Sequence, residues 1–328
     1  MPVAPRPLPD GLGPAFSCAE AQAAGVTPRR LRARDLSAPF RGVRAVTDAE
    51  PPASVIDPLW RQRTIRERTR RLAVAYAQIM PAHAVFAGRT AAVLLGGPVD
   101  PGADLVVAVP DPVRAPRRRG IRGVKVSRDL ARIATVDDLP VTDPPSTWSM
   151  LGAELDVREL VILGDAFVRV PRDSVGSQMP HARLATIDDL RASLTAGRRI
   201  GARKLRTALE LIREGSASPL ETDYRLDAAA AGLPDADLDV EVCDRQGRLV
   251  GISEFVYPTY RTIVEIEGDH HRVDRAQWDR DIEKYAAYSA LGWEVVRLTA
   301  RHVRHRRTAV AIVDDVLRRR GWDGTRPR

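Results

Sequence analysis

Cysteine is scarce in this sequence, and so are the features that mark secreted or membrane-bound chains. Its two cysteines, Cys18 and Cys243, stand too far apart to form a metal or redox pair by spacing. We therefore expect a reduced, cytoplasmic protein. No apolar run approaches the roughly 18 residues of a membrane span, so no membrane partner is predicted. Residues 1–14 are proline-rich, lack the apolar core of a signal peptide and are expected to form a flexible tail.

Acidic residues are outnumbered by basic ones, with 43 Asp and Glu against 51 Lys and Arg, which gives a net charge of +8. This excess favours a polyanionic partner, and nucleic acid is the first candidate. A GC-rich genome that uses arginine freely would produce the same excess without such a partner. The 328 residues allow about two domains at ~150 residues each.

The most informative stretch for function is residues 261–271, RTIVEIEGDHH, in which acidic and imidazole side chains follow a predicted strand. Its first half favours a strand, whose alternation places Glu265 and Glu267 on one face and apolar residues on the other. Two carboxylates this close resist joint ionisation without a cation. His270 and His271 follow directly, and such oxygen and nitrogen ligands suit Mg²⁺ or Mn²⁺. The alternative is a solvated strand end with chance histidines.

Near the N-terminus, two short helices are predicted at residues 18–24 and 29–34, capped by Ser17 and Thr27. With a glycine turn between them they form a helix-turn-helix pattern, and residues 40–46 follow as a β-wing. Arginines on the second helix and the wing suit phosphate and groove contacts. A basic surface helix without a DNA role is the alternative. The candidate DNA-binding residues are Arg29, Arg30, Arg32, Arg34 and Arg41.

Residues 51–200 read as an α/β middle domain without catalytic spacing. Helices are expected at 65–80 and 84–95, strands at 105–109 and 124–126, and a basic loop at 116–122. Asp165 and His181 are isolated and are interpreted as structural.

Residues 216–322 predict helix, three strands, helix, strand and helix. Ser218 and Glu221 have the spacing of a capping box at the start of the first helix. The remaining elements are expected at 238–242, 248–257, 262–267, 275–291, 293–299 and 308–320.

The N-terminal pattern resembles the winged-helix start of AbiEi-type antitoxins and their transcriptional-regulator relatives. The resemblance is carried by Phe16, Glu20, Gly25, the arginines at 29–30 and the Arg-Gly-Val at 41–43, and it covers roughly residues 15–175. It implies a winged helix-turn-helix at 15–50, DNA binding and autoregulation.

The C-terminal pattern resembles the Vsr-like (very-short-patch-repair-like) group of the PD-(D/E)XK nuclease superfamily. The matching positions are Ser218–Glu221, Glu254, Glu265–His271, Gln277, Asp281, Lys284 and residues 291–297. The resemblance implies a restriction-endonuclease-like αβββαβα domain that hydrolyses DNA with a divalent metal.

The resemblance also implies roles for these residues. Glu254 and Glu265 would hold Mg²⁺ or Mn²⁺, and Glu267 stands two residues after the second acid. Glu221 would complete the shell directly or through water. His270 or His271 would act as general acid or base, and Lys284 or Arg280 would stabilise the phosphate or orient water. Supporting positions are Gln277 and Asp281, which share a helix face with Lys284.

Structural roles explain several of these residues equally well: the capping box for Glu221, a surface salt bridge for Asp281 with Lys284, and helix packing for His271. The chain also departs from the family, because Glu254 replaces the usual aspartate and Glu267 stands where the lysine of the superfamily name would be. Two hypotheses follow. The first is an α/β metal-dependent DNA endonuclease targeted by an N-terminal DNA-binding region. The second is a catalytically weak or inactive DNA-binding regulator of antitoxin type.

Overall fold

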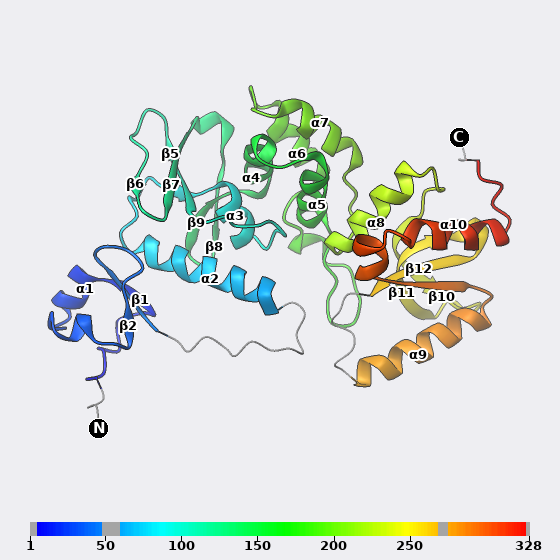
Figure 1. The fold of residues 1–328 in the computed structure, drawn as a ribbon, viewed down its shortest axis with the longest axis horizontal. Coiled ribbons are helices and arrows are strands. Elements are labelled where there is room, and N and C mark those ends of the chain that lie inside the picture. Colours follow the sequence, from blue (N-terminus) through cyan, green and yellow to red (C-terminus); the bar gives the residue numbers. More distant parts are fainter. Residues whose placement is uncertain (1–4, 48–59, 268–274, 326–328) are drawn as a thin grey trace. The chain divides into compact units, whose positions relative to one another are not determined.

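The computed structural model describes residues 5–47, 60–267 and 275–325, with side chains described from 63 onward in the second range and from 281 onward in the third. The chain divides into two compact units, residues 1–54 with 60–147 and residues 55–59 with 148–328 (Figure 1). Both units mix helices with sheets, so the predicted α/β class is confirmed at this level. No described helix is both long and apolar enough to cross a membrane.

The first unit opens with a small antiparallel sheet in the order β1-β3-β2. Its elements are β1 (Ala15–Ser17), α1 (Cys18–Ala23), the 3₁₀ turn η1 (Arg30–Arg32), β2 (Leu36–Ser37) and β3 (Val43–Val46). Phe16, Ala21, Val26 and Leu31 form its core. Ser17 caps α1 by accepting from the Glu20 amide, as the sequence predicted.

The second helix, predicted at 29–34, is shorter than expected. Thr27 does accept a hydrogen bond from the Arg30 amide at 3.2 Å. The chain then leaves helical geometry at Ala33, whose backbone is extended, and pairs as β2 from Leu36. Strand pairing within a few residues of the cap leaves room for a single 3₁₀ turn.

A six-stranded sheet forms the rest of the first unit, in the order β6-β7-β5-β4-β9-β8. Its strands are β4 (Val85–Phe86), β5 (Leu105–Pro110), β6 (Arg117–Arg118), β7 (Ile121–Val126), β8 (Ile133–Val136) and β9 (Leu139–Thr142). Helices α2 (Trp60–Ala77) and α3 (Gly88–Leu94) pack with it, and η2 (Arg128–Leu130) precedes β8.

Two predictions in this sheet were wrong. Residues 84–95 were expected to be one helix, but β4 precedes α3 because Val85 and Phe86 pair with β5 and Phe86 also pairs with β9. Residues 116–122 were expected to be a loop, but β6 and β7 form an antiparallel hairpin there. In the sheet, β4 and β7 each pair with a strand remote in sequence, so local propensity could not reveal them.

The second unit begins with a helical layer. It comprises part of α4 (Pro144–Met150), then η3 (Leu151–Ala153), α5 (Val157–Val168), η4 (Pro180–Ala182), α6 (Ile187–Thr195) and α7 (Ala202–Leu211). Buried Asp165 on α5 accepts hydrogen bonds from Arg225 and Thr222 on the next helix, α8 (Pro219–Ala230). This buried ion pair ties residues 148–212 to the C-terminal part of the chain. The predicted division into 51–200 and 216–322 stays a prediction.

The C-terminal part holds a four-stranded sheet in the order β10-β11-β12-β13, in which only the β12–β13 pair is parallel. After α8 come β10 (Asp237–Cys243), β11 (Leu249–Tyr257), η5 (Pro258–Tyr260), β12 (Thr262–Glu267), α9 (Arg275–Ala290), β13 (Glu294–Thr299), the π-helix η7 (Arg301–His305) and α10 (Ala309–Arg319). The order of the α-helices and strands is the one predicted from the sequence.

Helices cover both faces of this sheet (Figure 1). Val264 and Ile266 of β12 pack in the core shared with α8 and α10. Ile263 points to the other face and packs against Tyr288 of α9. The predicted alternation of β12 is therefore confirmed, and it turns Glu265 toward α9.

Candidate functional site

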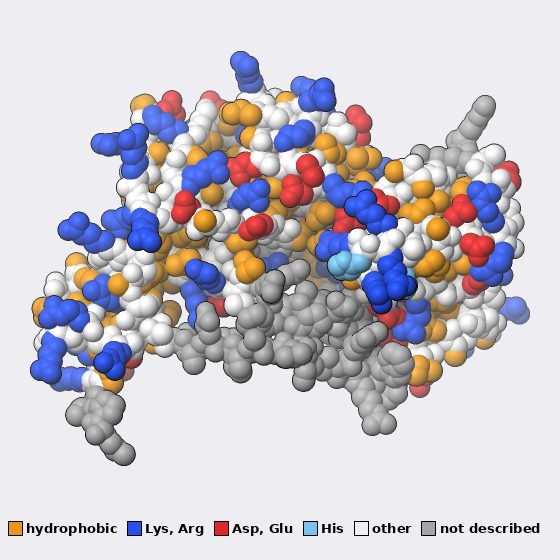
Figure 2. All heavy atoms as spheres, in the orientation of Figure 1, with side chains coloured by type: hydrophobic (Ala, Val, Ile, Leu, Met, Phe, Trp, Pro, Cys, Tyr) orange, Lys and Arg blue, Asp and Glu red, His pale blue; other side chains and the backbone are white. Residues whose placement is uncertain are grey.

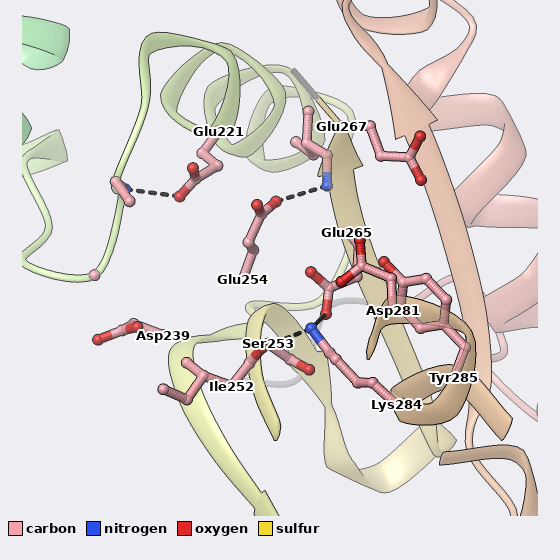
Figure 3. Close-up of a pocket in the computed structure, with 13 residues that line it drawn as sticks. Glu221, Asp239, Ile252, Ser253, Glu254, Glu265, Glu267, Asp281, Lys284 and Tyr285 are labelled. Atoms are coloured by element: carbon pink, nitrogen blue, oxygen red, sulfur yellow. Dashed lines mark hydrogen bonds and ion pairs between the residues drawn. The ribbon is translucent and has the colours of Figure 1, made fainter. Parts of the chain in front are cut away.

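A cavity of about 230 Å³ lies where the start of α8, strands β10 to β12 and helix α9 meet (Figure 3). Its described lining includes six carboxylates and one lysine: Glu221, Asp239, Glu254, Glu265, Glu267, Asp281 and Lys284. All of these except Asp239 were predicted as site residues from the sequence. They come from helices and strands that are well separated along the chain, so the fold, not local spacing, makes the cluster.

Glu254 and Glu265 face one cavity because strands β11 and β12 stop pairing beside them. The last register pair is Phe255 with Val264. Beyond it, the Glu254 carboxylate accepts a hydrogen bond from the Ile266 amide at 2.6 Å (Figure 3). The side chain thus satisfies a backbone donor that the strand ladder leaves unpaired, and this holds its carboxylate in the cavity.

Glu221 enters from the first turn of α8. Ser218 caps the helix by accepting from the Glu221 amide at 3.2 Å. The Glu221 carboxylate accepts from the Ala217 amide at 2.7 Å, so the expected return bond to the cap residue is replaced by one to its neighbour. The predicted capping box is half formed, and the 4% exposed Glu221 is aimed at the cavity instead.

Lys284 of α9 supplies positive charge to this cluster. Its ammonium donates to the Glu265 carboxylate at 2.9 Å and to the Ile252 carbonyl at 2.8 Å. Glu265 is 7% exposed, so this is a buried ion pair. Ser253 and Tyr285, which also line the cavity, were missed from the sequence because neither belongs to a charged pattern.

Glu267 is neutralised by an arginine, which the sequence did not reveal. Arg297, on the parallel neighbour β13, forms an ion pair with the Glu267 carboxylate and lies over the Tyr285 ring. Its register partner on β12 is Glu265. The negative charge of Glu267 is therefore already balanced by Arg297, which the sequence-based role for Glu267 did not anticipate.

Burial raises the pKa values of Glu221, Glu254 and Glu265. Desolvation, reinforced by Glu221 and Glu265, raises the pKa of Glu254 to about 9. Desolvation also raises the pKa of Glu221 to about 6, against hydrogen bonds from Ala217 and Ser218. The pKa of Glu265 is raised by burial and lowered again in part by Lys284. A cation in the cavity would reverse these shifts.

The donor chemistry suits a hard divalent metal, since every acid facing the cavity offers oxygen. Within the described residues, neither Glu221 nor Glu254 forms an ion pair. The same residues contain no group of three carboxylate, imidazole or thiolate side chains already close enough to hold an ion. The cavity therefore presents oxygen donors that face a common space without forming a closed cage.

Four predicted residues cannot be placed in the site. His270 and His271 lie outside the described residues, as do the side chains of Gln277 and Arg280 on α9. Their proposed roles stay predictions.

The predicted DNA-binding arginines divide into two kinds. Arg30 binds Asp35 through both ends of its guanidinium, at 2.9 and 2.7 Å, and its side chain is 11% exposed. This ion pair ties η1 to the start of β2 and gives Arg30 a structural role, while its predicted DNA contact stays a prediction. The others, Arg29, Arg32, Arg34 and Arg41, are at least partly exposed.

A second basic element lies beside the predicted wing. Arg118 of β6 donates to the Arg41 carbonyl at 3.1 Å. This contact places the exposed Arg117, Arg118 and Arg119 next to the β2–β3 connection. Lysine and arginine side chains are visible at several points on this unit in Figure 2.

No family model and no curated protein matches this chain. Among solved structures, the crystal structure of the RV2827C protein from Mycobacterium tuberculosis matches 64% of this chain and 74% of that chain, with 17% identity and a TM-score of 0.34. A likeness this weak carries no argument about function, which must be inferred from the chemistry of the site.

Proposed function

We propose that this chain is a metal-dependent DNA endonuclease. In this proposal residues 216–322 form a restriction-endonuclease-like domain of the Vsr-like group, and residues 15–50 form a winged helix that binds DNA. The observation that carries it is the convergence of Glu221, Glu254 and Glu265 on one cavity from three separate elements. Buried acids with raised pKa values are typical of functional sites.

Glu254, Glu265 and Glu221 would hold a magnesium or manganese ion. When bound, such an ion supplies Lewis acidity toward the phosphodiester and its attacking water. Lys284 donates to one oxygen of the Glu265 carboxylate and so fixes the side chain beside the cavity. It also provides an ammonium beside the second acid, which offsets the absence of a lysine at position 267.

Glu254 gives the proposed reaction a pH dependence. With its pKa at about 9 in the metal-free chain, its carboxyl group holds a proton at neutral pH. An ion must displace that proton to bind there, so metal affinity rises with pH.

The test is nicking of supercoiled plasmid by the purified chain in Mg²⁺ or Mn²⁺, with EDTA as the metal-free control. We expect nicking by the wild-type chain and none by Glu265→Ala, because the variant loses a carboxylate that faces the cavity. Nicking that persists in Glu265→Ala would remove this site from the reaction.

The second candidate is a DNA-binding regulator of antitoxin type in which the same fold only binds. The neutralisation of Glu267 by Arg297, and of Glu265 by Lys284, favours it. Tight DNA binding without nicking under either metal would support this candidate.

The N-terminal arginines provide a separate prediction. Arg32→Ala and Arg34→Ala should each lower the slope of log affinity against log salt by about one, because each removes one cation that neutralises a phosphate. Arg30→Ala should leave that slope unchanged but destabilise the first unit by about 1.5–3 kcal/mol, because it removes charged hydrogen bonds. Fluorescence anisotropy with labelled duplex and denaturant unfolding measure the two effects. If Arg30→Ala lowers the salt slope as much as Arg34→Ala does, Arg30 also contacts phosphate and its role is not purely structural.

A further inference from the structure

A strongly basic segment joins β13 to α10. Residues 301–307, RHVRHRR, contain four arginines, two histidines and one valine, and the next acidic residue is Asp314. We call residues 301–307 the basic segment. Figure 2 shows basic side chains with a histidine where Figure 1 draws the short helix ahead of α10.

The backbone of the basic segment is held in an unusual conformation. It forms the π-helix η7, and Arg307 after it has a positive φ of 50°. Both features are rare and occur often at functional sites. The His302 carbonyl accepts from the Thr308 amide at 3.0 Å, and its ring nitrogen accepts from the Thr299 amide at 3.1 Å.

Two side chains anchor the segment to the domain. Val303 is 4% exposed and belongs to the core that α8 and α10 share. Arg304 donates to Asp223 of α8 at 2.8 Å. Asp223 is also paired with Arg158, which in turn pairs with Asp227, so Arg304 is held in a network of two arginines and two aspartates.

The remaining basic side chains face outward. Arg301, His305, Arg306 and Arg307 are exposed. Among the residues that the structure describes, no acidic side chain pairs with Arg301, Arg306 or Arg307. Arginines without an acidic partner are suited to bind phosphate oxygens, since their donors form a fixed fork.

The segment starts beside the carboxylate cavity. Thr299, two residues before it, is the register partner of Glu267, which lines the cavity. Arg304 reaches Asp223 on α8, the helix whose first turn carries Glu221. The segment therefore follows the strand that pairs with Glu267 and is anchored to the helix that supplies Glu221.

We propose that the basic segment binds the sugar-phosphate backbone of the nucleic acid strand whose phosphodiester enters the cavity. This inference rests on the proposed function and adds to it a surface that positions the substrate. Carboxylates repel a polyanion, so a cavity rich in acids needs neighbouring cations that hold the strand. Arg306 and Arg307, at the exposed end of the segment, are the residues that contact phosphate.

The test compares DNA binding by the full chain and by R306Q/R307Q in EDTA, where no cleavage occurs. Anisotropy of a short fluorescein-labelled duplex is measured over a series of salt concentrations. We expect the double variant to lose about two units of the salt slope, one for each arginine that contacts phosphate, with equal loss on unrelated DNA sequences. The same loss should appear in the R29Q/R32Q/R34Q/R41Q background, since each arginine that contacts phosphate releases its own counterions.

The matched control is R203Q/R206Q, which removes the same charge from exposed positions on α7. Its slope should equal that of the wild-type chain. An unchanged slope in R306Q/R307Q, or an equal loss in the control, would overturn the inference. Unchanged DNA binding together with lost binding to phosphatidylglycerol vesicles would also overturn it, by assigning the segment to a membrane surface.

The plasmid assay separates this inference from the proposed function. If the wild-type chain nicks DNA and R306Q/R307Q binds DNA like the wild type, the proposed role of the basic segment is wrong and the endonuclease proposal stands. If the wild-type chain nicks DNA with neither metal and R306Q/R307Q still lowers the salt slope, the endonuclease proposal is wrong. The basic segment then binds DNA as part of a DNA-binding regulator.

Discussion

The Glu254→Gln variant is expected to nick plasmid at least about 100-fold more slowly than the wild-type chain, since it removes a charged ligand worth several kcal/mol in the transition state. Glutamine keeps the oxygen that accepts from the Ile266 amide, so the hydrogen bond between β11 and β12 at this point is retained. The measurement is the initial nicking rate in saturating Mg²⁺ or Mn²⁺. Unaltered nicking would exclude Glu254 from the proposed site.

The same variant should gain stability where it loses activity. The pKa of Glu254 is raised from 4.5 to about 9 by burial, so between these pH values the folded chain keeps a proton that the unfolded chain has released. Stability of the metal-free wild type therefore falls as pH rises through this window. Glutamine does not titrate, so the variant lacks this fall.

Thermal unfolding in EDTA at pH 5 and pH 8 measures the difference. We expect Glu254→Gln to melt higher than the wild type at pH 8, by roughly 2–4 °C for each ~1 kcal/mol, with a smaller gap at pH 5. Glu283→Gln, an exposed change on α9 with the same loss of charge, is the matched control and should melt like the wild type at both pH values. An equal gap at the two pH values would show that Glu254 does not titrate in this window.

Replacing Lys284 with methionine is expected to lower the free energy of unfolding by about 3–5 kcal/mol at pH 8, because it leaves a buried carboxylate without its cation. Glu265 is 7% exposed and receives the Lys284 ammonium at 2.9 Å. Denaturant unfolding measures the loss. The loss should shrink at pH 5, because burial already raises the pKa of Glu265 and removal of Lys284 raises it further.

Two variants test that explanation. Glu265→Gln combined with Lys284→Met should recover most of the stability, since it removes the orphaned charge together with its partner. Arg297→Met breaks the Glu267 ion pair, whose side chains are 40% and 25% exposed, and should cost no more than about 1 kcal/mol. A double variant as unstable as Lys284→Met would show that the lysine acts through packing and not through charge.

Local sequence rules predicted much of the C-terminal domain. Alternation along β12 identified which residues face the core, because strand geometry has a period of two wherever the strand lies. The same alternation singled out Glu265, whereas Glu254 was identified only from a family pattern. The sequence could not reveal that these carboxylates meet where the pairing of β11 with β12 ends. The last pair is Phe255 with Val264, and no local pattern in either strand marks that end.

Charge partners were the least predictable feature. Arg30, a predicted DNA contact, pairs with Asp35, while Arg297 and Lys284 neutralise Glu267 and Glu265. A long side chain can reach several acids, and its choice depends on burial and on which elements pack together. The basic segment shows the same limit, because its composition is plain in the sequence but its position beside the cavity is not.

The amino-acid sequence by itself determined the order of elements in residues 218–320 and the side chains that β12 turns toward each face, since both follow from short-range periodicity and capping. Tertiary structure alone decided which carboxylates share a cavity and which cation each one receives. The physical reason is that desolvation and ion pairing depend on distances between residues far apart in the chain, and only packing sets those distances.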